Sequence, residues 1–552
     1  MSLSRSTLVV SALSTLSLAA APPPLNVAEG FEVKQIYSVP KNEQGSWVAL
    51  TTDGKGRLIA SDQGGKGLFR ITVAADGNVK VEKMPAAISK AQGLLWAFDS
   101  LYVNVNPDGF FKVTDSTGDD LLDKVEPLKG SKGGGEHGNH AVILDEDGKN
   151  FFIDAGNHAN LPKDQVVSST VTSWDEDLLL PRQWDARGHA KGRLAPGGWI
   201  CRVTPDGKDY TVHSMGYRNQ YDIALNRFGD LFTYDADMEW DLGAPWYRPT
   251  RICHAVSGSD FGWRSGTGKW PTYYEDSLPP VIDIGPGSPT GVVSGIGAKF
   301  PAKYQDAIYA LDWTFGTMYA IHLKPEGASY VAEAEEFLSG VPLPLTDAVI
   351  GADGAMYFTT GGRGANSALW QVTYTGGGST AAPADKPSPE VAKAVALRRS
   401  LEKFHGKEDP TALAKAWPLL QSKDRFLRHA ARVAVESQPV DQWADKALSE
   451  KNPQAKVTAA VALARSGKKE LGPRLTEALL ATDPSSLDEG EFLGLLRAYA
   501  LNFIRLGAPS EDAKKKVIAQ LDPHLPSKSA DLNTELIRVL VYLDAPNIIT
   551  KT

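Results

Sequence analysis

Residues 352–362 read ADGAMYFTTGG, an Asp-Gly turn followed by a short apolar strand that ends in polar residues. A second strand pattern follows it, ALWQVTY at 368–374. Alternating apolar and polar residues bounded by such turns indicate β-hairpins, and regular repetition of hairpins is typical of a propeller. Copies of this unit predict six blades and are centred near Leu58, Tyr102, Phe152, Phe232, Tyr309 and Tyr357.

An earlier strand pattern, FEVKQIYSV at 31–39, precedes the first copy. We expect it to close the ring against ALWQVTY, because closure removes the exposed edges of a propeller. The longest intervals between copies run from Phe152 to Phe232 and from Phe232 to Tyr309, and they must contain insertions, where sites are commonly built. The prediction is an all-β six-bladed propeller over residues 25–375.

The composition and hydrophobic pattern of the chain change after a linker, residues 376–389, that is rich in glycine, alanine and proline. Alanine- and leucine-rich patterns such as RFLRHAARVAVES (425–437) then recur at intervals of about 30–40 residues. This period predicts paired helices of the HEAT type over residues 390–552, an all-α solenoid with a surface for a partner protein. The pattern stops at DAPNIITKT without a polar capping helix, so we expect the repeats to belong to a longer chain.

Residues 1–21 have the pattern of a secretory signal peptide, with Arg5, an apolar run from Leu8 to Leu18 and small residues after it. We expect an exported protein, periplasmic or extracellular, and an uncleaved anchor is the alternative. No later segment approaches the roughly 18 apolar residues of a membrane span. The net charge of -8 is spread along the chain, which argues against nucleic acid as a partner.

Familiar catalytic motifs give little direction. The sequence contains no Walker or dinucleotide-binding glycine pattern, no Gly-x-Ser-x-Gly, no His-Glu-x-x-His and no Cys-x-x-Cys-His for haem attachment. Its two cysteines, Cys201 and Cys253, are compatible with a disulfide in an oxidising compartment and equally with two buried thiols. Candidate chemistry therefore has to come from polar residues in loops.

The stretch KGGGEHGNHAVILDEDG (132–148) places polar residues in a glycine-rich loop just before a predicted strand. His137 can act as a general base, since its unperturbed pKa lies near neutrality and Glu136 can tune it. The alternative is a histidine that only hydrogen-bonds the loop at the rim. We expect His140 to be structural.

A second candidate site segment is GYRNQYD (216–222). It places the permanent cation of Arg218 beside the amide of Asn219, which both donates and accepts hydrogen bonds. Arginine suits an anionic or electron-rich cofactor edge. A surface salt bridge is the alternative interpretation for Arg218.

Two acidic stretches are candidate calcium sites, because calcium prefers hard oxygen ligands. DADMEWD (235–241) would project Asp235, Asp237 and Glu239 from one side if it is extended, and a solvated acidic edge is the alternative. DSTGDDLLDKVE (115–126) has Asp120 where a calcium loop has glycine, so a tight acidic turn is the alternative there. Its candidate ligands at loop positions 1, 3, 5, 9 and 12 are Asp115, Thr117, Asp119, Asp123 and Glu126.

At GEHGNHAVILDEDGK, MGYRNQYDIALNRFGDLF and GSDFGWRSG the chain resembles the soluble quinoprotein glucose/sorbosone dehydrogenases, six-bladed propellers that bind pyrroloquinoline quinone (PQQ) and calcium. A propeller followed by HEAT repeats also resembles large exported dehydrogenase-like proteins of planctomycetes and verrucomicrobia, which often continue into a cytochrome c domain. The resemblance implies that His137 takes the sugar hydroxyl proton as hydride moves to the quinone. It also implies that Arg218 and Asn219 lie over the cofactor, with Gln92 contacting the quinone.

The chain departs from this family at LDWTFG (311–316) and PLPLTDAV (342–349), where the family has a lysine and paired arginines. Those cations neutralise the PQQ carboxylates, and buried charges without partners are costly. We therefore expect at least two other basic side chains to converge on the site with His137 and Arg218. The candidates are Arg248, Arg251, Arg264, Lys269 and Arg363.

These observations favour an exported PQQ-dependent oxidoreductase that oxidises a sugar or polyol and passes electrons to an external acceptor such as cytochrome c, bound on the HEAT repeats. A non-catalytic propeller that binds carbohydrate or protein is one alternative. A calcium-dependent lactonase is another. Convergence of the basic residues on one cavity distinguishes the quinone hypothesis from these alternatives.

Overall fold

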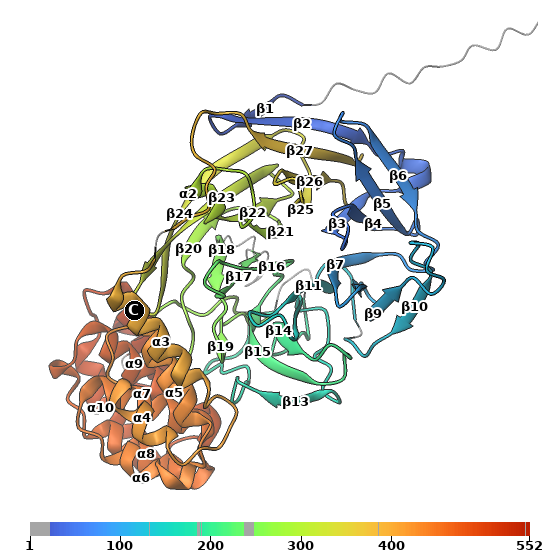
Figure 1. Ribbon diagram of the computed structural model, residues 1–552. Coiled ribbons are helices and arrows are strands. Elements are labelled where there is room, and N and C mark those ends of the chain that lie inside the picture. The colour runs from blue at the N-terminus through green and yellow to red at the C-terminus, as the bar shows by residue number, and fades with distance from the viewer. Residues whose placement is uncertain are drawn as a thin grey trace, which may run out of the picture.

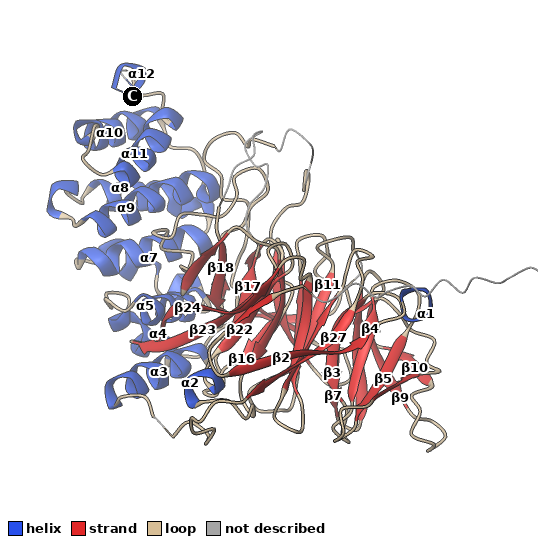
Figure 2. Cartoon of the chain, turned by 90° about the horizontal axis from the view of Figure 1, so that it is seen from above, coloured by secondary structure: helices blue, strands red, loops and turns tan. Residues whose placement is uncertain are grey.

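The computed structural model describes residues 23–131, 133–184, 188, 190–236, 248–384, 386–546 and 548–551. In this part of the chain a ring of sheets is followed by a stack of helices (Figure 1, Figure 2). The fold is a six-bladed β-propeller with a C-terminal helical solenoid, which confirms the predicted fold class. The predicted signal peptide lies outside the described residues.

Six sheets form the blades, and in each the strand nearest the axis comes first in the order below. The first blade contains β3 (Trp47–Thr52), β4 (Leu58–Asp62), β5 (Leu68–Val73) and β6 (Val79–Lys83), and the second contains β7 (Ala91–Ala97), β8 (Ser100–Val105), β9 (Gly109–Thr114) and β10 (Lys124–Pro127). The third blade contains β11 (Asn139–Leu144), β12 (Phe151–Ala155), β14 (Gly198–Val203), β15 (Tyr210–Tyr217) and β13 (Val166–Ser169), with β19 (Ser259–Asp260) beside β15. The fourth blade contains β16 (Ile223–Leu225), β17 (Leu231–Asp235), β18 (Thr250–His254) and β20 (Ile282–Gly285). The fifth contains β21 (Pro289–Ser294), β22 (Ile308–Asp312), β23 (Thr317–Glu326), β24 (Ser329–Gly340) and β1 (Leu25–Val27). The sixth contains β25 (Leu345–Ile350), β26 (Met356–Thr360), β27 (Ala368–Tyr374) and β2 (Phe31–Ser38).

The ring is closed by a strand from the start of the chain. β2 pairs antiparallel with β27, from Phe31 opposite Tyr374 to Ser38 opposite Ala368. This confirms the predicted closing strand. β1 adds to the fifth blade, with Leu25 opposite Gly340. Two strands from the start of the chain therefore complete the fifth and sixth blades, and the pairing of β2 with β27 closes the ring.

Neighbouring blades pack through buried apolar side chains, and their inner strands form a continuous ring around the axis. Small residues allow this close approach: a Cβ at Gly93 would lie 2.3 Å from the carbonyl oxygen of His140 on the next inner strand. In blades four and six, Asp222, directly before β16, and Asp347, in β25, accept backbone N–H groups of the following blade. Asp222 accepts from Val292 at 2.7 Å, and Asp347 accepts from Leu50 at 2.6 Å. These contacts fix the inner ring on which the site is built.

Alternating helices of the C-terminal region form an inner layer that faces the propeller and an outer layer (Figure 2). The inner layer is α3 (Pro389–Glu402), α5 (Arg425–Glu436), α7 (Pro453–Ser466), α9 (Glu489–Leu501) and α11 (Ala530–Tyr542), and the outer is α4 (Ala412–Ala416), α6 (Ala444–Ser449), α8 (Gly472–Leu480) and α10 (Glu511–Leu521). The remaining helical segments are α1 (Lys41–Gln44), α2 (Ala302–Gln305), α12 (Ile548–Lys551), the π-turn η6 (Asn502–Leu506) and the 3-10 turns η2 (Trp417–Leu419), η3 (Val440–Gln442), η4 (Lys469–Leu471), η5 (Pro484–Ser486) and η7 (Asp522–His524).

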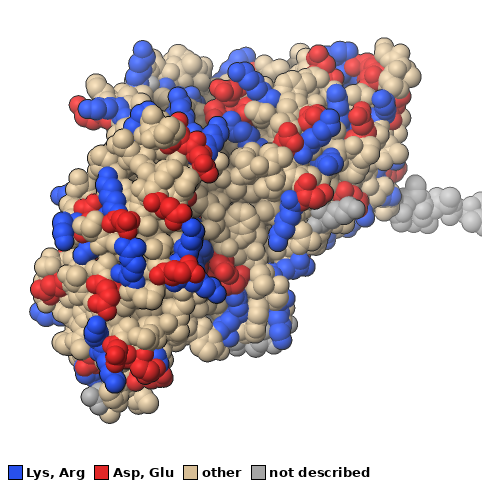
Figure 3. Space-filling view, turned by 90° about the horizontal axis from the view of Figure 1, so that it is seen from below, with Lys and Arg blue, Asp and Glu red and all other residues tan. Residues whose placement is uncertain are grey.

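Cys201 and Cys253 are both buried and free, so the two-thiol alternative describes them. Burial raises the pKa of the Cys253 thiol to about 12, which makes it unreactive at neutral pH. Among the described helices, none combines the length and hydropathy needed to cross a bilayer. Figure 3 shows a face on which basic and acidic side chains are interspersed, without a large area of one sign.

Candidate active site

A cavity of about 550 Å³ opens at one end of the propeller axis. Its wall is built from the ends of the inner strands and from the loops beside them, and every blade contributes. One residue from each blade in turn is Val48, Gln92, His137, Arg218, Trp313 and Thr346. Ligand sites of this size are typically concave and partly apolar, so this cavity is the candidate active site.

The structure brings together five of the residues proposed from the sequence. His137, Arg218, Asn219, Gln92 and Arg363 all line this cavity. Gln92 accepts a hydrogen bond from Asn106 Nδ2 at 3.3 Å, which orients its amide. These residues come from four blades and are up to 271 positions apart in sequence, so only the closed ring places them side by side.

The His137 imidazole is held in one orientation by the loop that follows β12. Its Nδ1 lies 2.6 Å from Asn157 Oδ1, and its ring stacks on that of His158 with centroids 4.5 Å apart. Because a carbonyl oxygen only accepts, Nδ1 must carry the proton in this arrangement. Nε2 is then the nitrogen that can take a proton from a substrate, as a general base requires.

Asn157 and His158 were not singled out from the sequence. They follow the strand FFIDA in the segment GNH at 156–158, a polar end to an apolar strand. That pattern also ends other blades, so nothing in it marks these two residues as partners of His137. Gly156 makes the arrangement possible, because a Cβ there would lie 2.5 Å from Asn219 Oδ1 and 2.8 Å from the His137 carbonyl.

The Arg218–Asn219 turn is held by a buried carboxylate. Asp235 Oδ1 accepts the N–H groups of Arg218 and Asn219 at 3.0 and 3.1 Å, and its Oδ2 lies 2.9 Å from Arg251 Nη2. The carboxylate of Asp235 is therefore used to hold the turn and is not arranged as a calcium ligand. The guanidinium of Arg251 pairs with Asp235 and does not face the cofactor cavity. Asn219 Oδ1 is buried and has no hydrogen-bond partner among the described residues, so it is available to a ligand.

Of the five basic residues proposed as substitute cations, Arg363 reaches the cavity wall. Its guanidinium lies 5.2 Å from the Trp313 ring and forms an exposed ion pair with Glu136 at 3.3 Å. The prediction that at least two of the five would converge there is not met within the described residues.

The other four basic residues serve the packing of loops instead. Buried carboxylates need cationic partners, and Arg251 and Arg264 fill this need for Asp235 and Asp260 at 2.9 and 2.8 Å. Lys269 Nζ donates to the Pro249 carbonyl at 3.0 Å, and Arg248 Nη1 donates to the Lys269 carbonyl at 2.9 Å.

The acidic stretch 115–126 covers the turn between β9 and β10, residues 115–123, and the first residues of β10. Asp115 accepts the backbone N–H groups of Thr117, Gly118 and Asp120, and Asp123 binds Ser116. Asp119 accepts the Leu121 N–H, and Glu126 lies in β10. The turn thus satisfies its own carboxylates, which supports the tight-turn alternative.

Asp120, at the position where a calcium loop has glycine, pairs with Arg57 at 2.6 Å. Within the residues that the structure describes, no three His, Cys, Asp or Glu side chains are grouped to hold a metal ion. Asp237 and Glu239, the other ligands proposed in the second acidic stretch, lie outside those residues. The structure therefore gives calcium binding no support at 115–126 or at Asp235.

Below the site, a second axial cavity of about 290 Å³ shares Gln92 and Tyr221 with the first. Asp222 and Asp347 line it. Burial raises the pKa of Asp222 to about 7, and burial together with the charge of Asp222 raises the pKa of Asp347. Both carboxyls therefore keep their protons to higher pH than an ordinary aspartate does.

No family model matches the chain, and no curated protein matches it. Among solved structures, the holo PQQ domain of a pyranose dehydrogenase from Coprinopsis cinerea is similar, at 13% identity and a TM-score of 0.46, over 64% of this chain and 97% of that one. The PQQ-bound aldose sugar dehydrogenase of Streptomyces coelicolor is 18% identical with a TM-score of 0.43, over 64% and 100%. A putative oxidoreductase (glucose dehydrogenase) of Thermus thermophilus is 17% identical with a TM-score of 0.43, over 62% and 100%.

Proposed function

We propose that this protein is an exported, PQQ-dependent oxidoreductase that oxidises a hydroxyl of a sugar or polyol and passes the electrons to an external acceptor such as cytochrome c. The observation that carries the proposal is the cavity itself. His137, oriented by Asn157, lines one volume of about 550 Å³ together with Arg218, Asn219 and Gln92. A candidate base and a set of cofactor-binding groups are thus within one pocket.

The cavity suits a planar, polyanionic heterocycle in volume and in donors. Its volume lies in the range of roughly 300–1,000 Å³ that is usual for cofactor sites. Arg218 and Arg363 supply guanidinium groups on its wall. Charge-assisted hydrogen bonds of this kind are the stronger ones, and we assign Arg218 as the main anchor.

When bound, PQQ would supply a two-electron acceptor for hydride. The chain's own part in the reaction is proton transfer and orientation. His137 Nε2 takes the hydroxyl proton, while Asn157 keeps the proton of the ring on Nδ1. Asn219, whose buried Oδ1 has no hydrogen-bond partner in the part of the chain that the structure describes, and Gln92 orient the bound groups by hydrogen bonds. Asp235 holds the Arg218–Asn219 turn in place during these steps.

A non-catalytic carbohydrate- or protein-binding propeller is the second candidate, and the small number of basic side chains at the cavity favours it. Arg363 is already paired with Glu136, so less positive charge faces the cavity than three PQQ carboxylates call for. The indole of Trp313 on the same wall suits the apolar face of a sugar. The calcium-dependent lactonase alternative lacks a described ligand group of the kind it needs.

One experiment separates the two candidates. The purified full chain is titrated with PQQ, and the complex is assayed with a panel of aldoses and polyols and an artificial electron acceptor. An oxidoreductase binds PQQ saturably, reduces the acceptor with at least one substrate, and loses PQQ affinity in R218Q. Sugar binding by calorimetry without PQQ binding would instead establish the carbohydrate-binding propeller.

A further inference from the structure

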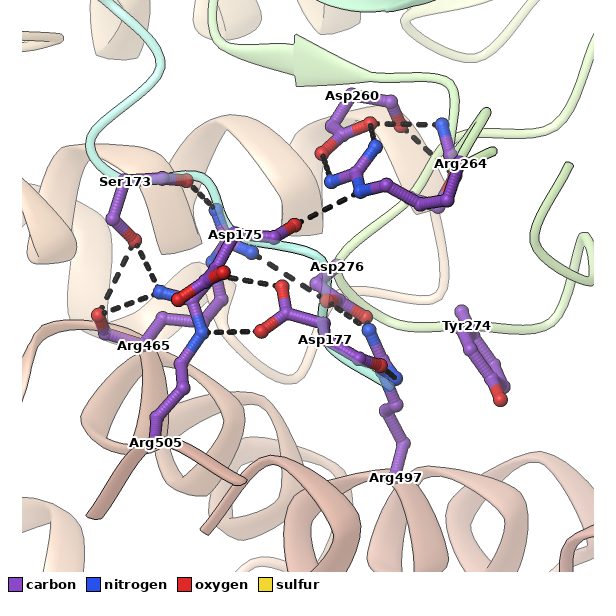
Figure 4. A network of polar contacts seen from close by, with 12 residues as sticks. Ser173, Asp175, Asp177, Asp260, Arg264, Tyr274, Asp276, Arg465, Arg497 and Arg505 are labelled. Carbon is purple, nitrogen blue, oxygen red and sulfur yellow. Dashed lines mark hydrogen bonds and ion pairs between the residues drawn. The ribbon is translucent and has the colours of Figure 1, made fainter. Parts of the chain in front are cut away.

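The inner layer of the helical solenoid makes ion pairs and charged hydrogen bonds with propeller loops along its whole length. Each of its five helices contributes at least one side chain. The contacts, in helix order, are Arg398 to Asp230 at 2.6 Å, Arg428 to Glu275 at 2.6 Å, Arg465 to Asp276 at 3.5 Å, Arg497 to Asp276 at 2.8 Å, and the Tyr273 hydroxyl to Glu535 at 2.9 Å. Part of this network is drawn in Figure 4.

Asp276 is the most enclosed of these propeller carboxylates. Its side chain has no exposed surface, and Arg497 binds it in a bidentate manner, with Nε at 2.9 Å and Nη2 at 2.8 Å. Burial alone would raise the pKa of Asp276, but the Arg497 guanidinium lowers it, so the carboxylate is charged. A buried charge of this kind is stable only while its partner is present. The guanidinium of Arg497 also lies 4.6 Å from the Trp270 ring, which holds it over the propeller loop.

Short contacts lead from Asp276 toward the candidate site. Ser277 Oγ, on the next residue, donates to the Asp260 carbonyl at 2.9 Å. Asp260 lies beside Met215 in a parallel bridge, and the following residue, Phe261, donates its N–H to the Met215 carbonyl at 2.9 Å. β15 ends two residues after Met215, directly before Arg218. The loop clamped by Arg497 is therefore hydrogen-bonded to the strand that presents the site.

A second route reaches the same turn through Arg251. Its Nη2 donates to the Phe261 carbonyl and to Asp235 Oδ2, both at 2.9 Å. Asp235 in turn receives the N–H groups of Arg218 and Asn219. Asp235 and Arg251 are buried, so water cannot replace these contacts if the loop shifts.

From these contacts we infer that Arg497 is a positioning residue for the candidate active site and that the helical solenoid is a structural part of that site. It acts through Asp276 and the 260–278 loop on the Arg218–Asn219 turn. The inference assigns the solenoid a role beyond presenting a partner surface. It rests on the proposed function only where binding of PQQ is used as a readout, because the position of the turn can be measured without a ligand.

The test is amide hydrogen exchange on the full chain, read at residues 217–221, for wild type and R497Q. We expect exchange in this segment to accelerate by roughly tenfold or more in R497Q, in line with typical coupling between sites. R474Q is the matched control, since Arg474 pairs with Asp445 at 2.7 Å on the exposed side of the same domain. L496A in α9 is a second control, because Leu496 is buried in the helical core and its truncation loosens that core while both members of the Arg497–Asp276 pair are kept. Neither control should change exchange at 217–221.

The double variant D276N/R497Q distinguishes positioning from general destabilisation. In R497Q the buried Asp276 carboxylate loses its bidentate partner and keeps only the longer contact to Arg465, at 3.5 Å. Removing this carboxylate should restore slow exchange at 217–221 at least in part, since the cost lies in the poorly compensated buried charge. PQQ affinity, where wild type shows it, should fall by about tenfold in R497Q and recover in the double variant.

Unchanged exchange at 217–221 in a folded R497Q would overturn the inference, as would equal acceleration in L496A. If R497Q does not fold, the same comparison is made with R497K, which keeps the charge but loses the bidentate contact. Failure of wild type to bind PQQ would overturn the proposed function and leave the exchange result as the test of this inference.

Discussion

The arginines on the cavity wall and those paired with buried carboxylates differ in what their guanidinium groups face. Arg363 faces an open volume and has an exposed ion pair. Arg251 and Arg497 face carboxylates with no exposed surface, at 2.9 and 2.8 Å. An arginine paired with a buried acid cannot readily bind a ligand instead, because separating the pair leaves a buried charge without compensation. A basic residue near a site can therefore contact a ligand only where it is not already paired with a buried carboxylate.

Substitution of Arg251 and of Arg363 tests this comparison most strongly. R251Q should lower the free energy of unfolding by about 3–5 kcal/mol, since Asp235 is left buried and unpaired. R363Q should change it by less than about 0.5 kcal/mol, because its ion pair is exposed. Urea denaturation of the full chain measures both. Equal losses would show that the two arginines do not differ in the way described.

Removal of His137 tests the cavity side alone. H137A or H137Q should reduce turnover roughly a hundredfold or more, because the general base is lost, while PQQ affinity is nearly kept. H322Q is the control, since His322 lies in β23, does not line the cavity and pairs with Glu335 at 2.7 Å. Steady-state assays and PQQ titration give the two quantities. Turnover that survives in H137A would remove this residue from the mechanism.

The pH dependence of stability tests the axial carboxyls. Asp222 and Asp347 have folded-state pKa values raised by burial, so between the ordinary value near 3.8 and the raised values the folded chain binds more protons than the unfolded chain. Their stabilising contribution is present at low pH and is lost as the pH rises through about 7 for Asp222. D222N should flatten the fall in unfolding free energy over this window by about 1 kcal/mol or more, measured by denaturation at several pH values. A parallel pH profile in D222N would contradict the assignment.

The smallest effect is expected at the acidic turn 115–123. Asp115 and Asp123 are hydrogen-bonded by the turn's own N–H and hydroxyl groups, and Asp120 pairs with Arg57, so these carboxylates have little to gain from calcium. The shift in thermal midpoint between calcium and chelator should be the same, within about 1 °C, in wild type and in D123N. Scanning calorimetry measures it. A calcium-dependent midpoint in wild type that is lost in D123N would restore the calcium prediction for this turn.

Much of the candidate site could be predicted because its residues lie in short, distinctive segments. His137 follows a glycine-rich run, and Arg218 and Asn219 are adjacent in sequence. The partners that orient them could not be predicted in this way. Asn157 is 20 residues from His137, and its polar character is shared by the ends of other blade strands. The substitute cations were misassigned for the same reason, since Asp260, the partner of Arg264, was visible in sequence but its burial was not.

The sequence alone determined the six turn-and-strand units, the closing strand and the helical repeats, because hairpins and helices depend on residues only a few positions apart. Only the tertiary structure decided which charged side chains face the cavity and which face one another. Arg497 and Asp276 are 221 positions apart, and no local pattern in either segment encodes the other. Such pairs form because a charge that is removed from water needs a partner of opposite charge. Which side chains are buried depends on the folded chain as a whole.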